Sequence, residues 1–226
     1  MTGASRSEDR TKANARPAAS RADWLVPAGL LALGIVPAIA GALRLAELGS
    51  GAAITPENAR FFAAPAPVVV HIVSAVLFSV LGAFQFSAGL RRRRPQWHRY
   101  TGRLAAPLGL AAALSGLWMT QFYPNADANF DGPAVYLMRL AAGFGMVGAM
   151  VLALAAIARR DIPAHQRWMT RAYALGMGAG TQVFTHVPWF LWPELQGELL
   201  RAMCMGAGWG VNIVVVEWVL SRPRGW

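Results

Sequence analysis

Four histidines are the residues in this chain best suited to chemistry, and they fall into two pairs. His71 and His186 each lie inside an apolar segment, about 7 Å and about 6 Å from its end at the 1.5 Å rise of an α-helix. Two neutral imidazoles on facing helices can ligate one haem iron, share a hydrogen bond or relay a proton. We therefore expect His71 and His186 to face one another and to bind haem b, a quinone or another lipophilic small molecule.

Polar residues on the same helical faces extend this prediction. Gln85 shares a stripe of 3.6-residue period with His71, and Gln182 shares one with His186. A polar stripe on a membrane-spanning helix faces the bundle interior or a water-filled cavity. The sequence thus predicts a cofactor site made of His71, His186, Gln85 and Gln182. Hydrogen bonds that merely join helices are the structural alternative.

The other two histidines lie in two similar basic segments, Pro95–Arg103 and Pro163–Arg171. Each segment places two arginines four residues apart at the start of a helix, where backbone N–H groups are unpaired. Such a surface favours an anion. We expect anionic lipid headgroups to bind there, and a phosphorylated ligand or a quinone carbonyl is the alternative. The residues concerned are His98, Arg99, Arg103, His165, Arg167 and Arg171.

The composition indicates that the elements positioning these residues lie in a membrane. Hydrophobic residues make up 55% of the 226-residue chain and charged residues only 14%, whereas a soluble domain carries about 25% charged residues. Six apolar runs are long enough to cross roughly 30 Å of hydrocarbon. They predict an all-α, polytopic transmembrane bundle over residues 24–220, with helices near 24–43, 66–88, 104–122, 135–158, 168–190 and 200–220.

Charge alternates between the connecting segments and predicts the orientation. Arginines dominate residues 1–23, 91–103, 159–167 and the tail 221–226, while the remaining connections carry the acidic residues. Because basic residues favour the cytoplasmic side, both termini are expected inside, with the chain in the bacterial inner membrane. The first 23 residues are expected to form a disordered basic arm. Cleavage of the first apolar run as a signal peptide, after Ala38-Ile39-Ala40, is the alternative.

The formal charge of +10 is attributed to this pattern and to anionic lipid, and no nucleic acid is expected as a partner. The single cysteine, Cys204, excludes an internal disulfide and a CxxC motif. The sequence also lacks a Gly-rich phosphate loop, a GxSxG elbow and an HExxH motif. These absences leave catalytic residues unknown and enzyme activity open.

The basic segments also carry a family resemblance. His98-Arg99-x-x-Gly102-Arg103 and His165-x-Arg167-Trp168-Met169-x-Arg171 resemble motifs of an uncharacterised bacterial integral-membrane family, domain of unknown function 2306. His71 and Gly82-x-x-Gln85-Phe86 add to the resemblance, which covers about residues 66–220. It implies a multi-pass membrane protein and marks these residues for testing. The family has no established activity to transfer.

The leading interpretation is a membrane bundle that binds a redox cofactor or a lipophilic small molecule between its second and fifth helices. Two alternatives use the same sequence features. In a small transporter or proton relay, the two intramembrane histidines and Gln85 would line a path. In a non-catalytic scaffold, they would only join helices. A Soret absorption band in the purified protein would separate haem binding from the other hypotheses.

The charge pattern makes a direct prediction about topology. Reporter fusions at both termini and after Arg94 should report a cytoplasmic location, and fusions near Asn129 and Gln196 an external one, because basic connections stay inside. An alkaline phosphatase and green fluorescent protein fusion pair at each position measures this. An external C-terminus would overturn the count of six helices.

Overall fold

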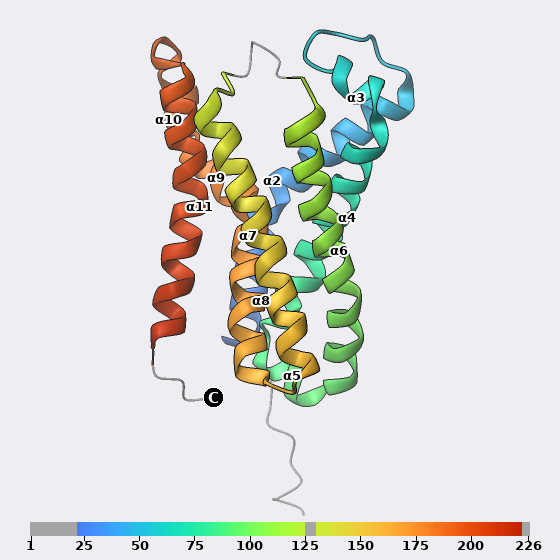
Figure 1. The fold of residues 1–226 in the computed structure, drawn as a ribbon, viewed down its shortest axis with the longest axis vertical. Coiled ribbons are helices and arrows are strands. Elements are labelled where there is room, and N and C mark those ends of the chain that lie inside the picture. The colour runs from blue at the N-terminus through green and yellow to red at the C-terminus, as the bar shows by residue number, and fades with distance from the viewer. Residues whose placement is uncertain (1–21, 125–129, 223–226) are drawn as a thin grey trace, which may run out of the picture.

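The computed structural model describes residues 22–124 and 130–222, and these ranges contain helices and no strand. The helices run side by side in a bundle whose two ends carry α3 and α5 (Figure 1), here named the α3 end and the α5 end. Almost all of the predicted arm 1–23 and most of the tail 221–226 lie outside the described residues. The elements are α2 (Ala22–Ser50), α3 (Ala59–Ala63), α4 (Pro65–Gln85), α5 (Ala88–Arg93), α6 (Pro95–Phe122), α7 (Pro133–Ala158), α8 (Ile162–Gly176), α9 (Gly178–Thr185), α10 (Val187–Leu191), η2 (Pro193–Leu195) and α11 (Glu198–Ser221).

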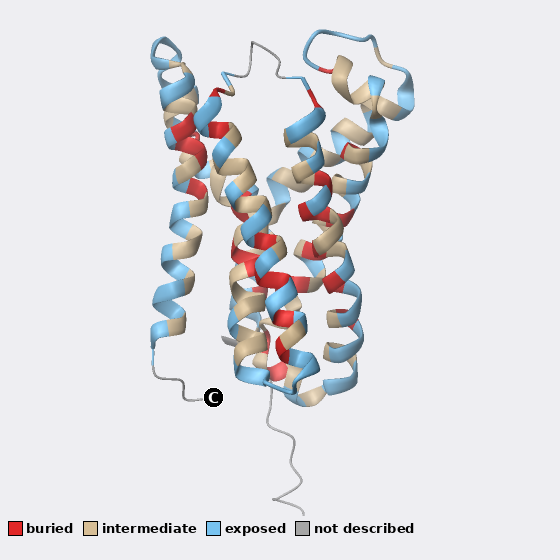
Figure 2. Cartoon of the chain, viewed as in Figure 1, coloured by how far each residue is buried: buried red, intermediate tan, exposed pale blue. Residues whose placement is uncertain are grey.

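Five of the described helices are long and apolar enough to cross a membrane: α2, α4, α6, α7 and α11. The shortest, α4, has 21 residues and is therefore about 32 Å long, enough for the hydrocarbon core. Large apolar side chains such as Leu43 and Val214 are exposed on the outer faces. Buried residues gather between the helices instead (Figure 2). The predicted all-α, multi-pass fold is confirmed.

Two helix boundaries differ from the sequence prediction. The third predicted helix, 104–122, starts earlier, because α6 begins at Pro95. A proline is accepted in the first turn, where its missing N–H has no helical partner. His98, Arg99 and Arg103 therefore lie on a helix that continues into the bundle, rather than in a connection before it. The first predicted helix, 24–43, extends to Ser50 and runs through Pro27 and Pro37.

The fifth predicted helix, 168–190, is not continuous. It is divided into α8, α9 and α10, with Met177 between the first two and His186 between the last two. Glycines flank the first break, and Pro188 near the start of α10 has no N–H with which to continue the preceding hydrogen bonds. Together the three segments extend from the α5 end toward the α3 end (Figure 1).

The core lies where α4, α6, α7 and α8 meet. Phe78, Met150 and Tyr173 are buried there in one cluster. The Tyr173 hydroxyl donates a hydrogen bond of 2.7 Å to the Ser79 carbonyl, so this aromatic ring satisfies its polar end by joining α8 to α4. Gly82 on α4 faces the same ring without a side chain, which lets the two helices approach closely.

The remaining long helices flank this core through polar contacts. On α11, Asn212 accepts a hydrogen bond from Thr181 at 2.6 Å and donates one to the Ala174 carbonyl at 2.9 Å, which fixes α11 against both α8 and α9. At the α5 end, Asp23 of α2 accepts from the backbone N–H of Gly89 at 3.0 Å. The Asn212 bonds satisfy a polar side chain in the middle of a membrane-spanning helix, where hydrocarbon offers no partner.

The close approach at Gly82 generates a stability prediction. A Cβ there would collide with the buried Tyr173 ring, so Gly82→Ala should destabilise the protein by about 1–3 kcal/mol. Gly148 is the matched control, because a Cβ on it would meet nothing within 4 Å. Apparent melting temperatures in detergent measure the difference. Equal melting temperatures for the two variants would show that α4 and α8 do not pack at Gly82.

Candidate functional site

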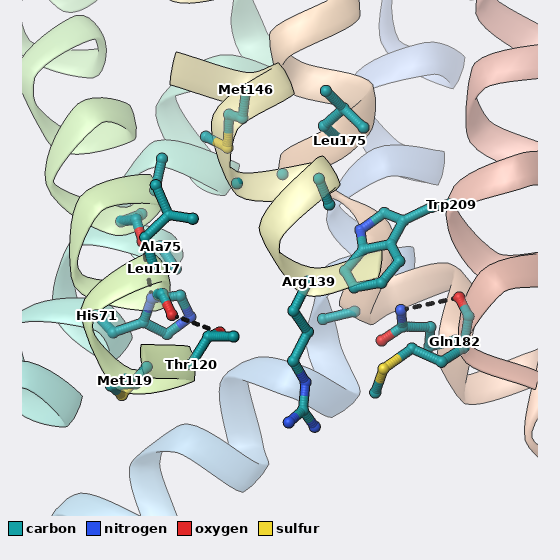
Figure 3. Close-up of a pocket in the computed structure, with 18 of the residues that line it drawn as sticks. His71, Ala75, Leu117, Met119, Thr120, Arg139, Met146, Leu175, Gln182 and Trp209 are labelled. Carbon is teal, nitrogen blue, oxygen red and sulfur yellow. Dashed lines mark hydrogen bonds between the residues drawn. The ribbon is translucent and has the colours of Figure 1, made fainter. Parts of the chain in front are cut away.

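A cavity of about 370 Å³ lies between α4, α6, α7, α8, α9 and α11. Its size is in the usual range for small-molecule sites. Most of its wall is apolar, with Phe78, Met146 and Leu175 among the lining residues. Five polar or charged side chains that matter below also line it: Arg60, His71, Arg139, Gln182 and the indole of Trp209. Figure 3 shows His71 and Gln182 on opposite sides, with Arg139 between them and directed away from Met146 and Leu175.

His71 is held in one orientation by α6. Its Nδ1 lies 2.9 Å from the Ala112 carbonyl and 3.3 Å from the Ser115 hydroxyl. A carbonyl can only accept a hydrogen bond, and Ser115 donates its own proton to Ala111, so Nδ1 carries the ring proton. The other nitrogen, Nε2, is then an acceptor. No residue in the described ranges bonds to it, so a neutral acceptor is available at the cavity wall.

Gln182 occupies the opposite wall, on α9. Its Nε2 donates to the Met205 carbonyl of α11 at 3.2 Å, which leaves its oxygen as an acceptor. The α11 backbone comes close at Gly208, where a Cβ would touch the Gln182 side chain. The break at Met177 places Gln182 on a separate short helix, and the cavity wall includes residues from both sides of that break, Gly176 and Ala179.

An ion cluster closes the α3 end of the bundle. Asp131, whose side chain is 4% exposed, pairs with Arg139 of α7 at 2.8 Å and with Arg201 of α11 at 3.2 Å. Arg201 also donates to Nε2 of His186 at 2.9 Å. Arg139 belongs to both this cluster and the cavity wall. The sequence already marked Arg139 as unusual, because an arginine within the apolar run 135–158 raises the free energy of insertion unless it is functional or paired.

His186 therefore has a different environment from His71. Its Nδ1 is 2.8 Å from the Gln182 carbonyl, so this nitrogen carries the proton and Nε2 accepts from Arg201. Both ring nitrogens are thus occupied, and His186 is not among the residues that line the cavity. The structure brings His71 and Gln182 to one cavity and places His186 in the ion cluster. Iron ligation by His186 would require it to leave Arg201.

Arg60, on the short helix α3, is the polar residue that sequence reasoning passed over. Its Nη1 donates to the Pro124 carbonyl at 3.2 Å, and its guanidinium lies over the Phe61 ring, 4.8 Å from the centroid. Its Nε is buried and has no hydrogen-bond partner within the described chain. Burial, and then the neighbouring charge of Arg139, lowers the pKa of the Arg60 guanidinium. No sequence pattern places Arg60, which lies between the first two predicted spans, beside the cavity.

The fourth predicted cofactor residue, Gln85, lies away from the cavity. It donates to the Thr101 hydroxyl of α6 at 2.8 Å, and Gly102 is beside its oxygen. This contact joins α4 to α6 near the α5 end. Within the described residues, no group of three or more His, Cys, Asp or Glu side chains could hold a metal ion.

The residues predicted to bind lipid headgroups lie in different environments. Arg99, Arg103 and Arg167 are exposed at the α5 end, where lipid headgroups could reach them. His98 and His165 are half-buried, and Nδ1 of His165 is 2.9 Å from the Ala153 carbonyl, to which it donates. The anion site formed by these five residues stays a prediction.

Arg171 has an anion from the chain itself. Its guanidinium donates two hydrogen bonds to the Glu217 carboxylate of α11, at 2.6 and 2.8 Å. This bidentate geometry is the strongest pairing available to arginine. A lipid headgroup at Arg171 would have to compete with it.

The fold and the cavity define a multi-pass helical membrane protein with an internal small-molecule-sized site. Residues 68–220 match the family described as "Predicted membrane protein (DUF2306)", and the chain belongs to that family. The resemblance noted in the sequence is thereby confirmed. No curated protein and no solved structure matches the chain.

The ion cluster leads to a prediction about Asp131. Replacing it by Asn removes the carboxylate that two arginines share, and breaking a buried pair in this way costs about 3–5 kcal/mol. Glu194→Gln is the control, because Glu194 is an exposed carboxylate in η2. We expect a large drop in apparent melting temperature for Asp131→Asn alone. Equal melting curves would mean that the cluster contributes little to stability.

Proposed function

We propose that this protein binds a lipophilic small molecule in the cavity between α4 and α8–α9, with its polar group donating a hydrogen bond to His71. The supporting observation is the combination of an apolar wall with one oriented imidazole, whose Nε2 is an acceptor that no side chain of the described residues bonds. Ligand sites usually join an apolar surface to a few placed polar groups of this kind.

The chemistry of Nε2 restricts the ligand. Since Nδ1 is protonated and bonded to Ala112, neutral His71 offers only a lone pair to the cavity. The matching ligand group is therefore a hydroxyl, as in a quinol or a lipid alcohol, rather than a quinone carbonyl. One such hydrogen bond contributes about 1 kcal/mol. Most of the affinity would come from contact with Phe78, Met146, Leu175 and Trp209, which line the wall.

Haem b held by His71 and His186 is a version of this proposal with less support. His186 lies outside the cavity lining and accepts a hydrogen bond from Arg201. A Soret band that disappears in both His71→Ala and His186→Ala, while both proteins still insert, would favour haem.

Transport of the same molecule is a second candidate. The observation in its favour is the break at Met177, because the cavity wall includes residues from both α8 and α9. Discontinuous helices commonly border substrate sites in transporters, where their ends reorganise during the cycle. Movement of the bound compound across proteoliposomes would separate transport from static binding. A proton relay through His71 would instead produce proton flux without the compound.

A cavity-filling substitution tests the proposal. Ala142 on α7 lines the cavity, whereas the adjacent Ala141 is exposed on another face. We expect Ala142→Leu to reduce the bound compound at least tenfold, because it fills space that the ligand needs, and Ala141→Leu to leave it unchanged. The measurement is mass spectrometry of solvent extracts from protein purified in mild detergent.

The same extracts also test the hydrogen bond. His71→Ala should lower the retained amount by roughly two- to tenfold, the value of one neutral hydrogen bond. If wild type and Ala142→Leu carry the same bulk lipids in the same amounts, no specific ligand occupies the cavity and the proposal is wrong.

A further inference from the structure

We infer that the ligand of this cavity is an amphiphilic acid that also carries a hydroxyl. Its carboxylate or phosphate is held by Arg60 and Arg139 at the α3 end, its hydroxyl donates to His71, and its apolar body lies deeper in the bundle. The inference rests on the proposed function, since it names the chemical class of the molecule in the same cavity. Its support comes from the charged side chains at the α3 end, which take no part in the hydrogen bond to His71.

Among the described arginines that contact this end of the cavity, Arg60 is the one without a carboxylate in a salt bridge. Arg139 and Arg201 share the single carboxylate of Asp131, and Arg44 pairs with Glu47. Arg60 forms no salt bridge with any carboxylate in the described ranges, and its buried Nε has no hydrogen-bond partner there. An acid placed between Arg60 and Arg139 would give Arg60 an anionic partner and would accept from its buried Nε. Guanidinium groups match the planar, bidentate geometry of carboxylate and phosphate oxygens.

Arg60 is also held in place before any ligand arrives. Asn58, buried just before α3, accepts from the Thr55 backbone at 2.7 Å and donates to Glu47 at 2.6 Å. At the other end of α3, the Tyr123 hydroxyl donates to the Ala64 carbonyl at 2.5 Å. These bonds tie the short helix to α2 and α6. A preorganised arginine loses little freedom on binding, which favours a ligand site over a solvated loop charge.

The residues that line the cavity change from charged at the α3 end to apolar in the core. On α7, Arg139, Ala142 and Met146 line it at positions i, i+3 and i+7, which share one face of the helix. This face leads from the guanidinium to the apolar core, where Phe78 and Leu175 also line the wall. A molecule with a charged head and an apolar body matches that order, and a molecule charged at both ends does not.

Electron spin resonance of full-length protein in phosphatidylcholine vesicles tests the inference. Spin-labelled stearic acid, at alkaline pH, should show a motionally restricted component with a relative affinity roughly tenfold above that of its methyl ester, the value of a charged hydrogen bond. Spin-labelled phosphatidylglycerol distinguishes the source of the acid. Restriction of stearate alone identifies a free acid, and equal restriction of both identifies a lipid headgroup.

Arg60→Gln should abolish the preference for acid over ester, and Arg139→Lys, which keeps a cation for Asp131, should reduce it. Arg159→Gln is the control, because Arg159 is exposed at the α5 end and does not line the cavity. The second arginine variant keeps the test valid if Arg60→Gln fails to insert. An unchanged preference in both cavity variants overturns the inference.

The failure of the two proposals can be told apart with Ala142→Leu. If acid and ester bind equally and both are lost in Ala142→Leu, the cavity binds lipophiles and only the acid inference fails. If neither probe is restricted beyond phosphatidylcholine in the wild type, and extracts show no specific compound, the proposed function fails as well.

Discussion

Polar groups inside this bundle must find partners within the chain, because the surrounding hydrocarbon offers none. Most of the structure can be understood from this constraint. Hydroxyls of Ser74 and Thr101 donate to backbone carbonyls one turn earlier, at 2.5 and 2.8 Å. Longer polar side chains reach across helices instead, as Arg171 does to Glu217. These contacts determine which helices are neighbours, since an unpaired partner would cost more than the pair contributes.

At the candidate site, the described chain does not supply every polar group with a hydrogen-bond partner. His71 satisfies one nitrogen through Ala112 and leaves the other as an acceptor, and Arg60 leaves a buried N–H without a partner in the described residues. Both groups line the same cavity. Buried polar groups are normally bonded, so exceptions call for an explanation such as a ligand. Arg60 Nε is such an exception, and a molecule bound in this cavity would bond both Arg60 and the Nε2 of His71.

The sequence predicted the membrane fold well, because long apolar runs and helix length depend on local composition. It predicted the cavity less well. Residue counting gives a depth along a helix but not the direction in which a side chain points across the bundle. His71 and His186 were expected to share one site on that basis, yet His186 bonds Arg201 while His71 lines the cavity. Arg171 was assigned an external anion because Glu217 lies 46 residues away in sequence, beyond any local pattern. The break in the fifth helix had a visible signal in Gly176, Gly178 and Pro188, but apolarity alone extends across it.

Small residues in this bundle have two opposite uses, and only the structure separates them. At Gly82 and Gly143 the space that a side chain would fill is taken by a neighbour; a Cβ on Gly143 would lie 2.6 Å from Leu117. These glycines bring helices together. Ala75, Ala112 and Ala142 instead border open volume, so their small size keeps helices from filling the gap. A bundle built only for stability would gain by larger side chains at such positions, since an unfilled cavity is destabilising in proportion to its volume. The alanines near His71 and Arg139 therefore support the interpretation that the cavity holds a ligand.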